Sequence, residues 1–325
     1  MDPYHSWQPT IAISNLKQRA RLIQKLRTFF ANRDILEVET PTLANHPVTD
    51  PHLTNFETRW FCPSQLKTQT LYLQTSPEYA MKRLLCAGSG SIYQICKAFR
   101  NEEHGRFHNA EFTILEWYRV NFDHWQLIDE VEALLIEVLQ CPKATRTSYQ
   151  QAFLSVLNID PLSANLAELQ ACCTNLGYGN IANNESNPDT LLQLLFCEKI
   201  ETTFDPDTPQ IIYHFPASQA ALAKLNKEDK RIAERFEVYF KGVELANGFH
   251  ELSDPAEQQI RFEQDNALRS AMNLPSASTD KHLLQALEHG LPPCAGVALG
   301  VDRLLMIALG ANHIEDVVSF TTPRA

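Results

Sequence analysis

Residues 296–310 read GVALGVDRLLMIALG, a strand of small residues that passes directly into an apolar helix. The two glycines within the strand allow a ligand to approach the backbone closely, because glycine has no side chain. Arg303 projects from the first turn of the helix, and Gly310 is suited to end it in a left-handed conformation. The stretch therefore predicts a strand over 296–300 and a helix over 301–309, with a ligand contact where they join.

A polar loop, RNEEHGRFHNA at residues 100–110, lies between two segments rich in Ile, Tyr, Phe and Trp. These segments, residues 91–99 and 111–118, have the composition of strands, and the loop is too long for a tight turn. We expect a long antiparallel hairpin with a functional loop. Arg100 can grip a phosphate through its planar guanidinium, and Glu102 can accept from an amine such as that of adenine.

Other segments predict the surrounding elements. The apolar positions of residues 14–32 recur at spacings of three and four, which is typical of an amphipathic helix. The remaining predicted elements are a strand over 35–38 that stops at Pro41, a strand over 71–74, a helix from the N-cap Ser76 to near Gly88, a strand over 237–245, a helix over 256–272, and a surface loop over 180–190. Hairpin-joined strands with helices between distant ones indicate an α+β fold with an antiparallel sheet, rather than a regular β-α-β alternation.

Composition limits the classes of function. The chain is 44 % apolar and 21 % charged, with a formal net charge of −11, which argues against a broad nucleic-acid surface because phosphate binding depends on Lys and Arg. The N-terminus has no apolar leader and no later run approaches a membrane helix, so we expect a cytoplasmic protein. The eight cysteines show no C-x-x-C pair, and we expect reduced cysteines that pack in the interior. Without repeats, residues 1–325 are expected to form a single domain with an insertion around 141–200.

Three separated segments, taken together in their order along the chain, resemble the motifs of a known family. Residues 19–43 (RARLIQKLRTFFANRDILEVETPTL), the loop region from Phe99 to Phe112, and residues 296–303 are similar to motifs 1, 2 and 3 of class II aminoacyl-tRNA synthetases. Residues 238–262 (VYFKGVELANGFHELSDPAEQQIRF) and 286–304 (ALEHGLPPCAGVALGVDRL) are similar to the lysine-specific group. The resemblance covers almost the whole chain and implies the class II catalytic core, an antiparallel sheet flanked by helices.

Three departures from lysyl-tRNA synthetases favour their paralogues that modify translation elongation factor P. Only about eighteen residues precede motif 1, so an anticodon-binding domain is not expected there, and no stable tRNA binding is expected. The acidic charge suits a protein acceptor better than tRNA. Ala298 stands where lysyl-tRNA synthetases have glycine, and its methyl would intrude near the substrate amine. A substrate whose amine is on the β carbon would avoid it, so the resemblance implies a lysine or β-lysine substrate.

The resemblance also implies cofactors, partners and roles. ATP and Mg²⁺ would drive formation of an aminoacyl-adenylate, followed by transfer to a lysine of elongation factor P, and the enzyme would be a homodimer. Arg100 and Arg303 would be the catalytic residues. The ATP site would comprise Arg100, Asn101, Glu102, His108, Asn109, Phe112, Glu244, Leu245, Gly300 and Arg303, with Glu244 at the metal, and the amino-acid site would comprise Ser76, Pro77, Glu78, Tyr118, Asn247, Phe249, Glu251 and Ala298.

Two groups of alternatives remain at this point. The first group is a truncated lysyl-tRNA synthetase, or a small amino-acid ligase such as an asparagine synthetase of the same fold. The second is a regulatory paralogue that only senses an amino acid. The pair Glu251 and Tyr118 favours a lysine-like ligand, and the two arginines, Arg100 and Arg303, favour catalysis over binding alone.

Overall fold

The computed structural model of the chain describes residues 7–325 and divides into two compact units. The first unit contains the chain up to Asp123, together with Glu137–Leu139 and Ser253–Ala325. The second unit contains His124–Ile136 and Gln140–Leu252. The C-terminal segment belongs with the N-terminal one because β11 pairs with β6 along its full length. A single domain over 1–325 stays a prediction.

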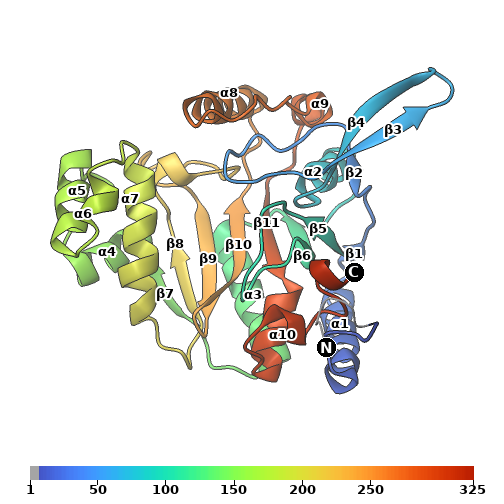
Figure 1. The fold of residues 1–325 in the computed structure, drawn as a ribbon, viewed down its shortest axis with the longest axis horizontal. Coiled ribbons are helices and arrows are strands. Elements are labelled where there is room, and N and C mark those ends of the chain that lie inside the picture. The colour runs from blue at the N-terminus through green and yellow to red at the C-terminus, as the bar shows by residue number, and fades with distance from the viewer. Residues whose placement is uncertain (1–6) are drawn as a thin grey trace. The chain divides into compact units, whose positions relative to one another are not determined.

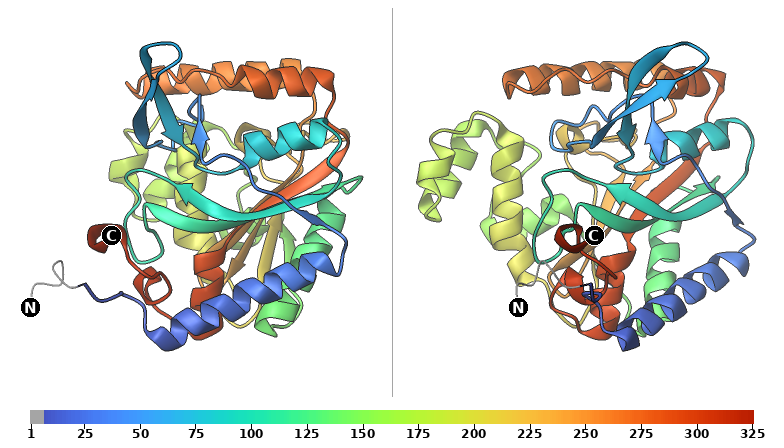
Figure 2. Two further views of the ribbon diagram at one scale, coloured as in Figure 1. Left: turned by 90° about the vertical axis from the view of Figure 1, so that its right-hand side faces the viewer. Right: turned by 45° about the vertical axis from the view of Figure 1, so that its right-hand side comes forward.

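The first unit is built on four adjacent strands in the order β1-β5-β6-β11 and a three-stranded sheet in the order β2-β4-β3. Its elements are α1 (Ile13–Ala31), β1 (Leu36–Glu37), β2 (Leu43–Ala44), β3 (Glu57–Cys62), β4 (Lys67–Leu73), α2 (Glu78–Cys86), β5 (Ile92–Phe99), β6 (Glu111–Val120), α8 (Pro255–Ala271), α9 (Lys281–His289), β11 (Cys294–Gly300), α10 (Val301–Leu309) and the 3₁₀ turns η5 (Ile314–Asp316) and η6 (Thr322–Arg324). Figure 2 shows β5 and β6 as one long curved ribbon with β11 beside β6. The predicted hairpin is confirmed.

Packing in the first unit follows the sequence pattern closely. Helix α1 buries Leu22, Leu26, Phe29 and Phe30, which lie three and four residues apart on one face. The ring of Phe30 stacks on Tyr93 of β5 at 4.3 Å between centroids. Helix α10 has the predicted bounds, and Gly310 ends it in the left-handed conformation at φ 63°.

The expected N-cap of α2 is wrong by one residue. Pro77 occupies the N-cap position, and the Ser76 hydroxyl instead accepts a hydrogen bond from the backbone N–H of Glu78 at 3.3 Å. The serine still satisfies a free N–H at the helix start, because Glu78 is the first residue of α2. Ser76, Pro77 and Glu78 therefore remain together at this helix N-terminus.

The second unit has the strand order β10-β9-β8-β7 and a group of helices. Its elements are most of α3 (His124–Leu139), β7 (Thr145–Ser148), α4 (Tyr149–Leu157), α5 (Leu166–Asn175), α6 (Gly179–Ala182), α7 (Pro188–Leu195), the π-helical turn η2 (Phe196–Ile200), the 3₁₀ turns η3 (Glu201–Thr203) and η4 (Ala217–Gln219), β8 (Gln210–Tyr213), β9 (Arg235–Phe240) and β10 (Val243–His250). Pairing is antiparallel except between β7 and β8 and, in the first unit, between β1 and β5. The α+β fold class is confirmed.

The predicted single strand over 237–245 is wrong, because two strands meet there in a tight hairpin. Lys241 and Gly242 both have positive φ, 53° and 72°, and join Phe240 of β9 to Val243 of β10. Two left-handed residues form the type of turn whose twist matches a hairpin. The Lys-Gly pair lacks the Asn or Asp that usually marks this turn, so the apolar run on each side looked continuous.

The region expected to be an insertion, residues 141–200, forms β7 and the helices α4 to α7 with η2. These helices gather beside β7 and β8 (Figure 1). They share an apolar core with the strands, in which Tyr149 stacks on Phe196 and which also contains Ile212 and Tyr239. The surface loop predicted over 180–190 is only partly a loop, because α6 and α7 extend into it and Asn187 caps α7.

The cysteines and the helices can be compared with what the composition led us to expect. All eight cysteines are free, and most are buried or half-buried. Among residues 7–325, no helix combines the length and the apolar character that a membrane crossing requires. The sequence analysis expected no apolar leader at the N-terminus. Residues 1–6 of that stretch lie outside the described part of the chain.

Candidate active site

The loop between β5 and β6 carries Arg100 at its start. The backbone N–H of Arg100 donates to the Ala110 carbonyl at 2.9 Å, which closes the base of the loop. The guanidinium lies 5.1 Å from the centroid of the Phe112 ring, and its nearest carboxylate is that of Glu103 at 3.6 Å. The Nε of Arg100 is buried and has no hydrogen-bond acceptor. An anionic oxygen would satisfy it, as expected for a phosphate-binding arginine.

Arg303 and His108 meet although they come from different motifs. The Nη2 of Arg303 lies 2.6 Å from the Nε2 of His108, and the histidine lies on the same loop as Arg100. Burial, and after it the positive charge of Arg303, lowers the pKa of His108. The imidazole is therefore neutral near pH 7 and accepts from the guanidinium. The structure thus joins the first helical turn of motif 3 to the loop of motif 2.

The other residues of the loop differ in their availability to a ligand. Glu102 is exposed at φ 68°, and Asn101 is tied to the Thr54 carbonyl through its backbone N–H. Asn109 is buried, and its side-chain amide is already used: it donates to the Glu111 carbonyl at 2.6 Å and accepts from Thr322. An ATP contact at Asn109 would therefore involve its backbone.

One face of β6 and β11 carries two of the residues expected to contact the amino acid, Tyr118 and Ala298, and one expected at the ATP, Gly300. Tyr118 is opposite Gly296, Ala298 is opposite Glu116, and Gly300 is opposite Ile114. Residues paired in this way point to the same side of a sheet, so the Ala298 methyl stands next to the Glu116 carboxylate. A methyl at this point narrows the space beside an acid.

Glu116 was missed by the sequence analysis. It is 2 % exposed, and the Tyr118 hydroxyl donates to its Oε1 at 2.5 Å. Burial, and after it the charge of Glu116, raises the pKa of the neighbouring Cys96 thiol to about 12. This face of the sheet therefore favours a cation. The signal that would have found Glu116 is the period of two in a strand, since it precedes Tyr118 by two residues.

The carboxylate of Glu78 already has a cationic partner. It accepts from the Nζ of Lys82, one helical turn further on, at 2.7 Å, and that lysine is almost completely buried. Glu78 also has its backbone N–H bonded to Ser76. A second amine at Glu78 would share the carboxylate with Lys82.

In the second unit, β10 carries four of the predicted residues, Glu244, Leu245, Asn247 and Phe249. The fifth, Glu251, directly follows the end of the strand. A β-bulge between Glu244 and Ala246 leaves Leu245 without a partner in the ladder with β9. The bulge also places Glu244 and Asn247 on one face although they are three residues apart, since they oppose Tyr239 and Glu237 of β9. Glu251 follows the strand and is 4 % exposed.

Glu237 is a second acid that the sequence analysis missed. It lies on the same face of the hairpin as Glu244, and its two carboxylate oxygens contact the Arg235 guanidinium and the Tyr239 hydroxyl. Burial, and after it the charges of Glu237 and Glu244, raises the pKa of Tyr239 well above its usual value. Glu244 therefore shares this face with an acid whose two oxygens already have a guanidinium and a hydroxyl as partners.

A different cluster in the second unit has ligand types suited to a transition metal. The donor atoms of His124, Glu234 and His250 lie within 4.8 Å of one another. Glu234 Oε2 and His250 Nδ1 are only 2.5 Å apart, and His124 Nε2 is 3.1 Å from His214 Nε2. Such short separations are those of direct hydrogen bonds between side chains, whereas His124 Nδ1 lies 4.0 Å from Glu234 Oε2.

The first unit thus combines an antiparallel set of strands, which bears the buried acid Glu116, with a loop and a helix on which Arg100, His108 and Arg303 lie. The family model for class II tRNA synthetases (D, K and N) matches residues 4–324. The chain belongs to this family, and the predicted fold and ligase class are confirmed; class II ligases of this kind use ATP.

Curated relatives match the chain from end to end. A protein of Vibrio cholerae is 58 % identical over 319 residues, one of Hamiltonella defensa 56 % over 320, and one of Edwardsiella ictaluri 54 % over 325. The match covers 98 to 100 % of the chain and of each relative. All three are named elongation factor P--(R)-beta-lysine ligase.

The contact between His108 and Arg303 predicts a pH dependence. The lowered pKa of His108 means that its neutral form is favoured in the folded protein. The contribution of this neutral form to the stability of the fold is fully present above the usual histidine pKa of about 6.5. It is lost as the pH falls from there to the lowered pKa, when a second cation faces Arg303. We expect kcat/KM for ATP to fall on the acid side of pH 6.5.

The variant His108→Gln tests the origin of that acid limb. Glutamine keeps an acceptor for Arg303 but cannot be protonated, so the acid limb should disappear from the pH profile of ATP–pyrophosphate exchange. An identical acid limb in the variant would mean that another group causes it.

Proposed function

We propose that this protein activates (R)-β-lysine with ATP and transfers it to the ε-amine of a lysine on translation elongation factor P, with weaker use of α-lysine. The observation that carries the proposal is the grouping of Arg100, His108 and Arg303 next to a sheet face that bears the buried Glu116. The end-to-end similarity to relatives named for this reaction supports the choice of substrate and acceptor.

In the first step the carboxylate of the amino acid attacks the α-phosphate of ATP, and pyrophosphate leaves in line. Arg100 holds the α-phosphate and the carboxylate together, where negative charge gathers in the transition state. Arg303 binds the γ-phosphate end, and His108 fixes the direction of its guanidinium. Phe112 stacks on the adenine, while Glu102 and the backbones of Asn101 and Asn109 bind its edge.

The metal that the reaction requires is assigned to the acids of the β9–β10 hairpin. Glu244 provides an oxygen ligand of the kind that Mg²⁺ prefers, and the raised pKa of Tyr239 is consistent with the negative charge on this face. When bound, Mg²⁺ would neutralise part of the triphosphate charge. The backbone of Leu245 and the strand residue Gly300 are assigned to the nucleotide as well.

The amino-acid side chain carries an ammonium that requires buried anions. We assign this role to Glu251 and to Glu116, whose carboxylate is oriented by the Tyr118 hydroxyl. Phe249 lines the aliphatic part, and Asn247 binds the carboxylate end. Glu78, with Ser76 and Pro77, meets the second amine. Its carboxylate is shared between that amine and Lys82, so part of its negative charge is already balanced.

Ala298 is assigned as the residue that selects the position of the second amine. Its methyl stands opposite Glu116 in the β6–β11 ladder, so Ala298→Gly would enlarge the site next to the acid. We expect this variant to use α-lysine more readily, by roughly tenfold in kcat/KM relative to β-lysine, which is the discrimination a methyl group commonly supplies. Competitive exchange assays with both amino acids measure the ratio, and an unchanged ratio would show that the methyl is not the selector.

In the second step the ε-amine of the acceptor lysine attacks the adenylate, forms an amide and releases AMP. With an acceptor in the translation machinery, we propose that the enzyme acts in the cytoplasm. We also propose a homodimer through motif 1, because Leu36 and Leu43 within it and Ile13 shortly before it are apolar and more than 40 % exposed. Sedimentation at the mass of a single 36.9 kDa chain would contradict the dimer.

A further inference from the structure

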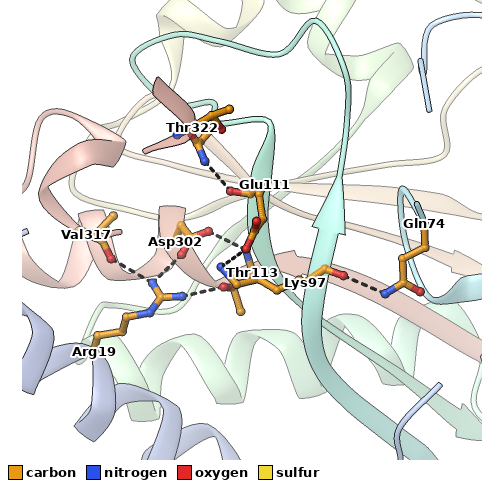
Figure 3. A network of polar contacts seen from close by, with 9 residues as sticks. Arg19, Gln74, Lys97, Glu111, Thr113, Asp302, Val317 and Thr322 are labelled. Atoms are coloured by element: carbon orange, nitrogen blue, oxygen red, sulfur yellow. Dashed lines mark hydrogen bonds and ion pairs between the residues drawn. The ribbon is translucent and has the colours of Figure 1, made fainter. Parts of the chain in front are cut away.

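Behind the ATP-binding residues, the first unit contains a buried ion pair between parts of the chain that are 283 residues apart in sequence. Arg19 of α1 donates from Nη1 to the Oδ1 of Asp302 at 2.5 Å and from Nη2 to the Thr113 hydroxyl at 2.7 Å. The other oxygen of Asp302 accepts from the backbone N–H of Thr113 at 2.7 Å. Figure 3 shows these three side chains closing a ring.

The ring lies where regular strand pairing ends. The ladder between β6 and β11 stops at Ile114 opposite Gly300, because the chain enters α10 at Val301. The next N–H along β6, that of Thr113, would lose its partner at this point. The Asp302 carboxylate takes the place of the missing strand, and Arg19 balances its charge.

Burial makes the ring rigid. Asp302 is 2 % exposed and both of its oxygens are bonded, while Arg19 also donates to the Val317 carbonyl at 3.1 Å. Charge-assisted hydrogen bonds are short and strongly directional, and in a buried site they are not weakened by solvent. The positions of Thr113 and Asp302 are therefore fixed relative to each other.

Thr113 follows Phe112 in sequence, and Asp302 precedes Arg303. We propose that Arg19, Asp302 and Thr113 are positioning residues for ATP: they set the distance between the side chain assigned to stack on the adenine and the side chain assigned to the γ-phosphate. The inference rests on the proposed function for the roles of Phe112 and Arg303. The amino-acid residues Glu116 and Tyr118 are outside the ring, within the regular ladders, and do not depend on it.

Two mild variants test the ring without leaving a buried charge unpaired. Thr113→Val keeps the shape and the backbone N–H but removes the acceptor for Arg19, and Thr113→Ser keeps the hydroxyl as the matched control. Arg19→Lys keeps the charge next to Asp302 but cannot bond both partners. For Arg19→Lys and Thr113→Val we expect kcat/KM for ATP to fall roughly tenfold, since small displacements of substrate-binding groups have large effects on rate. In both of these variants, KM for β-lysine should change by less than about twofold. Thr113→Ser should behave as wild type.

The readouts are ATP–pyrophosphate exchange and direct ATP binding, with thermal unfolding to show that each variant is folded. A loss confined to ATP supports the positioning role, because a general loss of structure would affect both substrates. Equal losses for ATP and β-lysine, or wild-type ATP parameters in both folded variants, would overturn the inference. If wild type itself exchanges with no amino acid, the proposed function fails, whereas ATP affinity still tests the ring.

Discussion

Replacing Arg100 by alanine is expected to reduce ATP–pyrophosphate exchange by roughly 10³-fold or more, which is the scale on which an arginine stabilises phosphoryl charge in a transition state. The guanidinium has a carboxylate no closer than 3.6 Å and a buried Nε without an acceptor, so its hydrogen-bonding capacity is not used by the protein. Its removal should therefore change the chemistry more than the fold. Exchange at saturating ATP and amino acid, followed by thermal unfolding of the variant, measures both effects.

Arg106→Ala is the matched control for this prediction. Arg106 lies on the same loop, is exposed, and donates to the Asn312 carbonyl at 2.8 Å. It should leave exchange within a few fold of wild type. Normal exchange by Arg100→Ala would remove Arg100 from the mechanism, and equal losses in both variants would point to a damaged loop rather than a lost catalytic group.

The second large effect is expected at Glu251. Removing one member of a buried ion pair costs about 3–5 kcal/mol, because the other charge stays desolvated, and each 1.4 kcal/mol is about tenfold in affinity. We therefore expect Glu251→Ala to weaken β-lysine binding by roughly 10²-fold or more, while ATP binding is retained. Isothermal titration with each ligand separates the two.

Two further variants give this test its meaning. Glu251→Gln keeps the shape of the side chain and removes only its charge, and it should show most of the same loss. Glu228→Gln changes an exposed acid of the same unit and should bind β-lysine as wild type does. Retained β-lysine affinity in Glu251→Gln would exclude the carboxylate as the partner of the ammonium.

The parts of the fold that could be predicted are those determined by neighbouring residues. The bounds of α10 follow from a short apolar helix that begins after a small-residue strand and ends at Gly310, and the structure has the same bounds. The β5–β6 hairpin follows from two aromatic strands around a polar loop. In both cases the signal and the element lie in the same few residues.

The parts that were missed depend on backbone detail or on residues far apart in sequence. The Lys241–Gly242 turn divides a run that looks like one strand, because both residues adopt positive φ without the usual Asn or Asp. Glu237 becomes visible as a site candidate only when register shows that it stands opposite Asn247, whereas the spacing of two residues before Tyr118 could have indicated Glu116. The pairing of Arg19 with Asp302 spans 283 residues, and no local pattern predicts it.

The candidate site was predicted mainly through family resemblance rather than through spacing. The residues of the β5–β6 loop and of β11 lie in the first unit, where Arg303 of α10 contacts His108 of that loop. The roles of individual residues stay predictions. Asn109 shows why the structure matters here, since its side chain is used to hold Thr322 and Glu111.

The most direct test of the account is the transfer of labelled β-lysine by the purified protein, with ATP and Mg²⁺, to elongation factor P and to lysine tRNA in parallel reactions. The account predicts label on the protein, dependent on ATP and on the acceptor lysine, with little on tRNA and with α-lysine a weaker substrate. Label on tRNA, with α-lysine preferred, would contradict it and make this chain a tRNA-charging enzyme. The absence of transfer to both acceptors, with the amino acid bound, would instead indicate an amino-acid sensor.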